Sequence, residues 1–223
     1  MLLTEIINAI KPQHIIGQAN PQTDIQHLLT DSRELKKGDG TRGTGDGTAN
    51  TTLFFALRTA KNDGAKYIPE LYAEGVRAFV LGNGQWLTAQ SQWVMNHNDA
   101  AFIVVADALE ALQDLAAEVR NSFNGTVIGI TGSNGKTVVK EWLYQLLKDD
   151  YTVIRSPKSY NSQIGVPLSV WQLSNSEAVL QSEGRSGKAA ALPIRGGHQP
   201  AGRDGTAGED HPSDDRCDHV YRA

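Results

Sequence analysis

Six residues in the middle of the chain have the types and order that bind phosphate. They follow an apolar run at 127–131 and are Gly132, Ser133, Asn134, Gly135, Lys136 and Thr137. Glycines let backbone N–H groups approach phosphate oxygens, and the N-terminus of a following helix adds partial positive charge. In such a loop the lysine reaches the β- and γ-phosphates and the threonine hydroxyl ligates Mg²⁺. The stretch therefore predicts a nucleotide site in which Lys136 and Thr137 are the catalytic groups and Thr137 the metal ligand.

The glycine spacing of this loop departs from the general phosphate-loop pattern. That pattern has a glycine five positions before Gly135, where this chain has Ile130, and the nearest glycines are Gly129 and Gly132. A plain turn between a strand and a helix is the alternative interpretation. Glycine, lysine and threonine in this order at a helix start favour the phosphate loop instead.

The segments around the loop alternate between strand and helix. Apolar runs at 102–106 and 127–131 predict strands buried on both faces, as in a parallel sheet, and 151–155 predicts another strand. Asp107, followed three residues later by Glu110, is typical of a helix start. The helix after it has one apolar face, made by Leu109, Leu112, Ala116, Val119 and Phe123. A second helix begins at about Lys136, with a predicted inward stripe of Val139, Trp142, Leu143, Leu146 and Leu147.

The N-terminal half shows the same alternation. It contains a predicted amphipathic helix at 1–11, a buried strand at 52–58, a short helix at 68–75 and a strand at 78–81. We therefore expect an α/β chain with a small N-terminal α/β domain and a following parallel-sheet domain around the phosphate loop. A polar stretch at 121–126 predicts the boundary between them.

Composition excludes several classes of function. A formal net charge of −4 argues against a nucleic-acid partner, which usually requires a basic excess. No run approaches the roughly 20 apolar residues of a spanning helix, so membrane insertion is not expected. The N-terminal sequence does not resemble an export signal, and the single cysteine, Cys217, excludes an internal disulfide framework. These features predict a cytoplasmic protein.

Several motifs together resemble the Mur ligases, the ATP-dependent amide-forming enzymes of peptidoglycan synthesis. The phosphate loop has the variant glycine spacing of that family. Residues 159–167, Ser-Tyr-Asn-Ser-Gln-Ile-Gly-Val-Pro, resemble the segment that borders the nucleotide and metal, which implies a nucleotide-binding role for Asn161. Two N-terminal motifs resemble the domain that binds the UDP-sugar, and they imply five substrate-binding residues: Asp31, Ser32, Arg33, Asn62 and Asp63.

The resemblance is strongest to members that add D-alanyl-D-alanine, in the form fused to an alanine racemase. It implies an ADP-forming ligase that joins D-alanyl-D-alanine to UDP-N-acetylmuramoyl-tripeptide, with ATP and Mg²⁺ as cofactors. Pyridoxal phosphate would belong only to a racemase half absent from this chain. The family usually has histidine after Asn-Asp-Gly, whereas this chain has Ala65.

Ordinary structural roles remain open for the weaker motifs. An aspartate and serine pair such as Asp31 and Ser32 is more often a turn or a helix cap. Asn161 could equally be an ordinary loop amide. Two further functions also stay open: a non-catalytic nucleotide-binding protein, and a Mur ligase that adds a single amino acid.

Two glycine-rich stretches do not fit the family pattern. Residues 38–52 contain no large apolar side chain and predict a flexible insert. Residues 175–223 predict a disordered tail. We also predict that this tail is read in a shifted frame, entered between Ser174 and Ile194. Read one base later, permitted codons for 195–223 can encode EAGISQPGEMERLEKIIHPTIGVITYIG, which has the glutamate and the Gly-Ile-Ser of the family. The predicted organisation is thus 1–122 for the UDP-substrate domain, 123–174 for a partial ATP-binding domain, and 175–223 for the tail, in a fragment without turnover.

Overall fold

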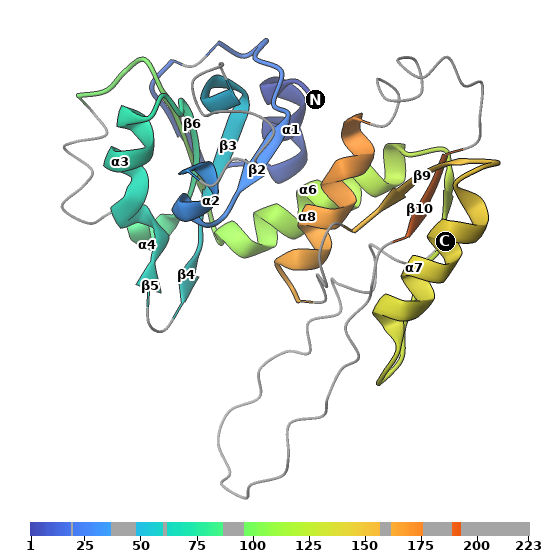
Figure 1. Ribbon diagram of the computed structural model, residues 1–223. Coiled ribbons are helices and arrows are strands. Elements are labelled where there is room, and N and C mark those ends of the chain that lie inside the picture. Colours follow the sequence, from blue (N-terminus) through green and yellow to red (C-terminus); the bar gives the residue numbers. More distant parts are fainter. Residues whose placement is uncertain are drawn as a thin grey trace, which may run out of the picture. The chain divides into compact units, whose positions relative to one another are not determined.

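The computed structural model describes residues 1–18, 20–36, 48–59, 62–86, 96–156, 162–175 and 189–192. The chain divides into two compact units, Met1–Leu115 and Ala116–Ala223 (Figure 1). The division falls within the long helix α6 (Ala108–Ser122), upstream of the polar stretch at 121–126. The α/β fold class expected from the sequence is confirmed.

The first unit is built on a five-stranded sheet of order β1-β7-β6-β3-β2. Its strands are β1 (His14–Ile16), β2 (His27–Leu29), β3 (Thr52–Ala56), β6 (Ala78–Gly82) and β7 (Ala101–Val105). All neighbours pair in parallel except β1, which pairs antiparallel with β7 at the edge. Every residue of β3 and of β7 is buried, as expected for parallel strands that are covered on both faces.

Helices cover both faces of this sheet, and Figure 1 shows α3 (Ile68–Ala73) and α1 (Leu3–Ile10) on opposite sides. On the α3 side, Phe79 stacks on Phe102 with ring centroids 5.3 Å apart and meets Phe54 edge-on. Ile68 and Leu71 of α3 belong to the same buried cluster. The aromatic side chains of three neighbouring strands therefore form the centre of the core.

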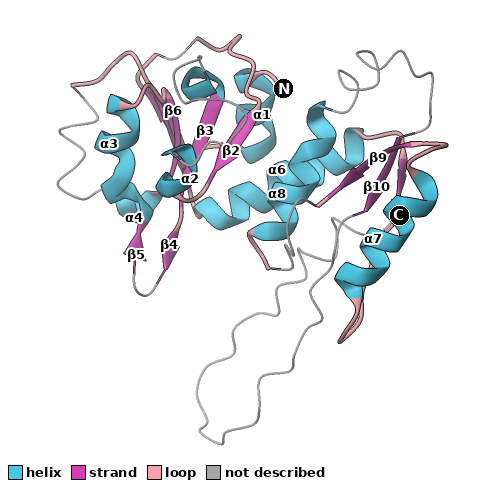
Figure 2. Cartoon of the chain, viewed as in Figure 1, coloured by secondary structure: helices cyan, strands magenta, loops and turns pink. Residues whose placement is uncertain are grey.

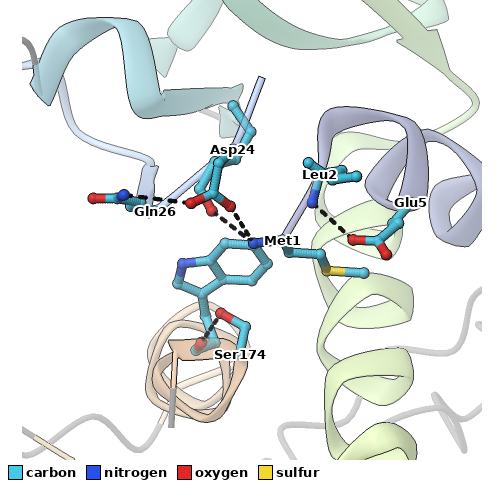
Figure 3. Close-up of polar contacts among 8 residues, drawn as sticks. Met1, Leu2, Glu5, Asp24, Gln26 and Ser174 are labelled. Atoms are coloured by element: carbon cyan, nitrogen blue, oxygen red, sulfur yellow. Dashed lines mark hydrogen bonds and ion pairs between the residues drawn. The ribbon is translucent and has the colours of Figure 1, made fainter. Parts of the chain in front are cut away.

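The first residues of the chain are fixed by polar contacts (Figure 3). The Met1 amine donates to Asp24 Oδ1 at 2.7 Å, and the backbone N–H of Leu2 donates to Glu5 Oε2 at 2.7 Å. The Met1 ammonium lowers the pKa of Asp24, since it stabilises the carboxylate form. These contacts begin α1, whose Leu3, Ile6 and Ile10 are buried, as the pattern at 1–11 predicts.

Short elements complete the first unit (Figure 2). They are α2 (Ser32–Lys36), η1 (Thr48–Thr51), β4 (Arg58–Thr59), β5 (Asn62–Asp63), η2 (Gly64–Tyr67) and α4 (Asn83–Trp86). The flexible insert predicted at 38–52 needs a correction at its end, because 48–51 form η1 and Thr52 begins β3. Residues 38–47 lie outside the described residues.

The helix start predicted at Asp107 is confirmed. Its Oδ1 accepts the backbone N–H groups of Leu109 at 2.7 Å and Glu110 at 3.0 Å, which satisfies two of the free donors at the start of α6. Leu112, Ala116 and Val119 on the predicted face are buried.

The second unit has a three-stranded parallel sheet of order β8-β10-β9. Its elements are β8 (Thr126–Val127), α7 (Lys136–Leu147), β9 (Thr152–Arg155), α8 (Gly165–Trp171), η3 (Gln172–Asn175) and β10 (Ala189–Leu192). The regular strand before the phosphate loop ends at Val127, so it is shorter than the run 127–131 suggests. β10 is a further correction, because it lies within the tail predicted to be disordered. Most of 175–223 lies outside the described residues.

Helix α7 contradicts the predicted inward stripe. Trp142 is 68% exposed and Leu146 is 74% exposed, and Val139 is exposed as well. Lys140 is instead the buried residue of this helix. The other two residues of the predicted stripe, Leu143 and Leu147, are half-buried, so the described elements cover this face only in part.

Candidate functional site

The phosphate-loop residues adopt a backbone that explains both glycines. Gly132 has φ of +150° and Gly135 has φ of +78°, and Gly135 is the N-cap of α7. Residues that carry a side chain rarely adopt such φ angles, whereas glycine adopts them at little cost. Added Cβ atoms would meet nothing closer than 3.6 Å at Gly132 and nothing within 4 Å at Gly135. The backbone conformation, rather than a lack of space, therefore requires glycine here.

Lys136 and Thr137 are the first two residues of α7, as the sequence predicts. The Lys136 ammonium donates to the carbonyl oxygen of Gly132 and lies 3.4 Å from that of Ser133. Its charge thus lies within the loop that precedes the helix, beside the backbone that a phosphate would approach. The helix N-terminus adds positive potential at the same place.

Thr137 can supply one oxygen ligand to a cation. Mg²⁺ in nucleotide sites commonly takes one or two protein oxygens and completes its shell with phosphate oxygens and water. Within the described ranges, no group of three or more histidine, cysteine, aspartate or glutamate residues could hold a metal ion. The Thr137 hydroxyl is thus an oxygen donor of the kind that fits a metal arriving with a nucleotide.

The second nucleotide motif lies at the start of α8. The hydroxyl oxygen of Ser162 accepts the backbone N–H of Gly165 at 3.0 Å, and the Val166 N–H donates to the Ser162 carbonyl at 3.0 Å. These contacts form the turn that leads into α8. Asn161, for which we expect a nucleotide-binding role, lies outside the described residues.

The proposed substrate motifs of the first unit lie at the same end of its sheet. Asp31 follows β2, and the hairpin β4–β5 with Asn62 and Asp63 follows β3. Because β2 and β3 are parallel neighbours, both motifs lie at the carboxyl end of the sheet, where open α/β sheets bind ligands.

The Asp31-Ser32-Arg33 motif forms a cap and an ion pair. Asp31 Oδ1 accepts the Arg33 backbone N–H at 3.0 Å, and Asp31 Oδ2 lies 2.6 Å from Arg33 Nη2. The hydrogen bond from the guanidinium to Asp31 raises the pKa of Arg33. Ser32 is buried, whereas the Arg33 side chain is exposed. The motif therefore has the cap role of the ordinary interpretation and also presents a guanidinium to solvent.

Asp63 is held in one orientation by two donors. Its Oδ1 accepts the Ala65 backbone N–H at 2.9 Å and Gln85 Nε2 at 2.6 Å. Its Oδ2 lies 4.0 Å from Nε of the exposed Arg58. An added Cβ at Gly64 would come within 2.9 Å of the Ala56 backbone, so close packing requires glycine after Asp63.

Sequence reasoning missed two residues beside Asp63, Arg58 and Gln85, and one buried residue of α7, Lys140. Arg58 ends the strand predicted at 52–58 and had no assigned role. Gln85 is buried, and no pattern around it signals this. Lys140 lies one helical turn after Lys136, and that spacing is a signal which could have drawn attention to it.

Comparison with known proteins identifies the relationship. The Mur ligase middle domain matches residues 130–183. The UDP-N-acetylmuramoyl-tripeptide--D-alanyl-D-alanine ligase of Bacillus subtilis is 32% identical over 174 residues, which are 76% of this chain and 34% of that protein. The ligase of the same name from Treponema pallidum is 34% identical over 144 residues, 64% of this chain and 31% of that protein. The chain belongs to the Mur ligase family.

Solved structures agree with this Mur ligase assignment at the level of the fold. The UDP-N-acetylmuramoylalanyl-D-glutamyl-2,6-diaminopimelate--D-alanyl-D-alanyl ligase of Acinetobacter baumannii matches with a TM-score of 0.63 and 24% identity. The match covers 88% of this chain and 36% of that one. This Mur ligase chain thus spans about a third of the length of the relatives it matches. Among its described helices, none is long and apolar enough to cross a bilayer.

Proposed function

We propose that this chain is part of an ATP-dependent, ADP-forming amide ligase that joins D-alanyl-D-alanine to UDP-N-acetylmuramoyl-tripeptide. The observation that carries the proposal is the phosphate loop, with left-handed Gly135 at the start of α7 and Lys136 folded over the loop, inside the segment that matches the Mur ligase middle domain. The relatives at 32% and 34% identity are named for this reaction.

The reaction begins with transfer of the γ-phosphoryl group of ATP to the free carboxylate of the tripeptide. The amine of D-alanyl-D-alanine then attacks the acyl phosphate, and loss of phosphate leaves an amide. Negative charge on the phosphates must be neutralised, which is the role of Lys136; Thr137 would hold Mg²⁺, which would supply further positive charge there. Gly132, Ser133, Asn134 and Gly135 present backbone N–H groups, and Asn161 borders the nucleotide.

The first unit binds the UDP-linked substrate in this proposal. The two motifs follow the parallel strands β2 and β3 and so lie at the same carboxyl end of the sheet. They are Asp31, Ser32 and Arg33 after β2, and Asn62 and Asp63 after β3. Arg33 presents a cation suited to a phosphate, and the fixed carboxylate of Asp63 is suited to a hydroxyl group. Because its proposed substrates are nucleotide-linked precursors, we expect the protein to act in the cytoplasm.

Binding of ATP by the 223-residue chain tests the nucleotide part. Lys136→Met removes the ammonium from the loop and should weaken ATP binding by about tenfold to a hundredfold, the range expected for a charged hydrogen bond. Lys148→Met is the matched control, since Lys148 is an exposed lysine just after the same helix. Equal affinity in the wild type and Lys136→Met would contradict the proposed loop.

Phosphate release tests the reaction itself. In a longer chain that contains this sequence, ATP-dependent release that needs both UDP-N-acetylmuramoyl-tripeptide and D-alanyl-D-alanine supports the ligase. We expect this chain to bind without turnover, because it spans about a third of its relatives. Release with a single amino acid in place of the dipeptide would point to a different Mur ligase. A longer chain that contains this sequence and still binds ATP without release would indicate a non-catalytic nucleotide-binding protein.

A further inference from the structure

A buried lysine in the second unit has no role in the site described so far. Lys140 is 3% exposed, and it lies on α7 one turn after Lys136. Lysine is almost never fully buried unless its charge is paired, because an ammonium without partners loses its hydration. The contacts that compensate Lys140 therefore indicate what it holds together.

The Lys140 ammonium joins α7 to the end of β9. Its Nζ donates to the carbonyl oxygen of Ser156 at 2.9 Å and lies 3.3 Å from Glu141 Oε1. Glu141 also pairs with Arg155, whose guanidinium lies over the ring of Tyr144 at 3.9 Å. The face of α7 toward β9 is thus held by charged and polar contacts.

The polar contacts continue from β9 to α8. The hydroxyl oxygens of Ser156 and Ser169 lie 3.0 Å apart, and the Ser169 hydroxyl donates to the Gly165 carbonyl oxygen at 2.9 Å. Ser156 and Ser169 are both buried. We refer to Lys140, Ser156, Ser169 and Gly165 as the buried polar chain.

The two ends of the buried polar chain are the two elements with nucleotide motifs. α7 begins with Lys136 and Thr137, and α8 begins at Gly165 in the Gly-Val-Pro sequence. Apolar packing of α7 is incomplete, because Trp142 and Leu146 face solvent and Leu143 and Leu147 are only half-buried. The position of the phosphate-loop helix against α8 therefore depends on the contacts of Lys140.

We propose that Lys140 is a positioning residue that, through the buried polar chain, fixes the phosphate-loop helix relative to the start of α8. It has no contact with the nucleotide itself. The functional consequence rests on the proposed nucleotide site: with Lys140 in place, Lys136 and Thr137 are held where the β- and γ-phosphates bind.

Hydrogen–deuterium exchange of the full chain tests the positioning without any ligand. In Lys140→Met, exchange should rise by about tenfold at 131–140 and at 162–170, since a hydrogen bond to a charged group is lost. Exchange in β3 and β6 should not change. Lys148→Met is the control and should match the wild type throughout. Unchanged exchange at 162–170 in Lys140→Met would overturn the proposal.

Ser169→Ala breaks the buried polar chain at its other end. It should raise exchange at both 131–140 and 162–170 by a smaller factor, and it keeps the proposal testable if Lys140→Met does not fold. A rise confined to 162–170 would count against coupling between the two helices.

Nucleotide affinity separates positioning from simple destabilisation. Loss of positioning should weaken ATP, which has β- and γ-phosphates, by about tenfold more than AMP, which lacks them. Lys140→Arg keeps a cation and should recover part of the ATP affinity. A merely structural role would lower the fraction of protein that binds and leave both dissociation constants unchanged. If the wild type does not bind ATP, the proposed function fails, and the exchange comparison alone decides the role of Lys140.

Discussion

Each of the two units of the chain is stabilised internally by a different kind of contact. In the first unit, β3 and β7 are completely buried, and across neighbouring strands Phe79 stacks on Phe102 and meets Phe54 edge-on. In the second unit, α7 buries a lysine and exposes a tryptophan and a leucine. Hydrophobic packing therefore determines the first unit, whereas glycine backbone angles and buried polar contacts determine the phosphate-loop region of the second.

Truncation of a core side chain gives the sharpest test of this contrast. Phe79→Ala removes a fully buried ring that contacts two other aromatic rings, and it should lower the free energy of unfolding of the first unit by about 3 to 5 kcal/mol. Leu146→Ala, at a site 74% exposed on α7, should change stability by less than about 0.5 kcal/mol. Denaturant unfolding measures both. A large loss in Leu146→Ala would mean that something covers α7 in solution.

The polar contacts of the first unit provide a second test. Gln85 is buried between Gly82, whose N–H donates to Oε1 at 2.8 Å, and Asp63. Gln85→Leu leaves both partners without this hydrogen bond and should cost about 1 to 3 kcal/mol in unfolding free energy. Gln145→Leu, at an exposed position of α7, should cost almost nothing. If the two variants are equally stable, Asp63 is not held by Gln85.

A pair of glycine substitutions tests the backbone explanation for the second unit. Gly135→Ala forces a side chain into a left-handed conformation and should cost about 1 to 2 kcal/mol, measured as reduced ATP affinity and reduced stability. Gly129→Ala is the control, since its Cβ would meet nothing within 4 Å and its φ lies outside the left-handed region. Equal effects at the two positions would show that the φ of Gly135 does not matter.

The smallest expected effect is at the start of the first unit. The Met1 ammonium lowers the pKa of Asp24, so this pair stabilises the fold at neutral pH and loses its contribution as the pH falls through the lowered pKa. Asp24→Asn should cost no more than about 1 kcal/mol at pH 6, as is usual for exposed pairs. Below about pH 4 the difference from the wild type should shrink. A difference that grows on acidification would contradict the assignment.

The sequence predicted the elements whose signals are local. The cap at Asp107, the buried strand at 102–106 and the helix start at Lys136 all depend on neighbouring residues, and each is confirmed. Helical spacing also placed the apolar residues of α7 on one face. It could not tell whether another element covers that face, because burial depends on residues far away in the chain. For the same reason nothing local indicated that Lys140 is buried.

The substrate and nucleotide motifs divide in the same way. Gly132 and Gly135 were singled out by the phosphate-loop pattern, and their positive φ explains why glycine stands at each position. The contact between Asp63 and Gln85 joins residues 22 positions apart, and no pattern in either segment announces it. The assignment of the motifs to ligands stays a prediction.

The tail remains the least predictable part. The proposed change of reading frame between Ser174 and Ile194 stays a prediction, and sequencing of the gene would test it. The family match extends to residue 183, and β10 pairs with β8 and β9 at 189–192. The end of the family match favours a frame change after residue 183, within the range up to Ile194.

The exposed face of α7 determines what unfolding experiments on the second unit can detect. The slope of unfolding free energy against denaturant follows the surface newly exposed, and this helix already has much of its apolar surface in water. Trp142 is 68% exposed and Trp171 is 5% exposed. On unfolding, the emission of Trp142 should shift little, whereas Trp171 passes from a buried site into water. Trp171 is therefore the better fluorescent reporter of this unit, and Trp142 contributes a nearly constant background.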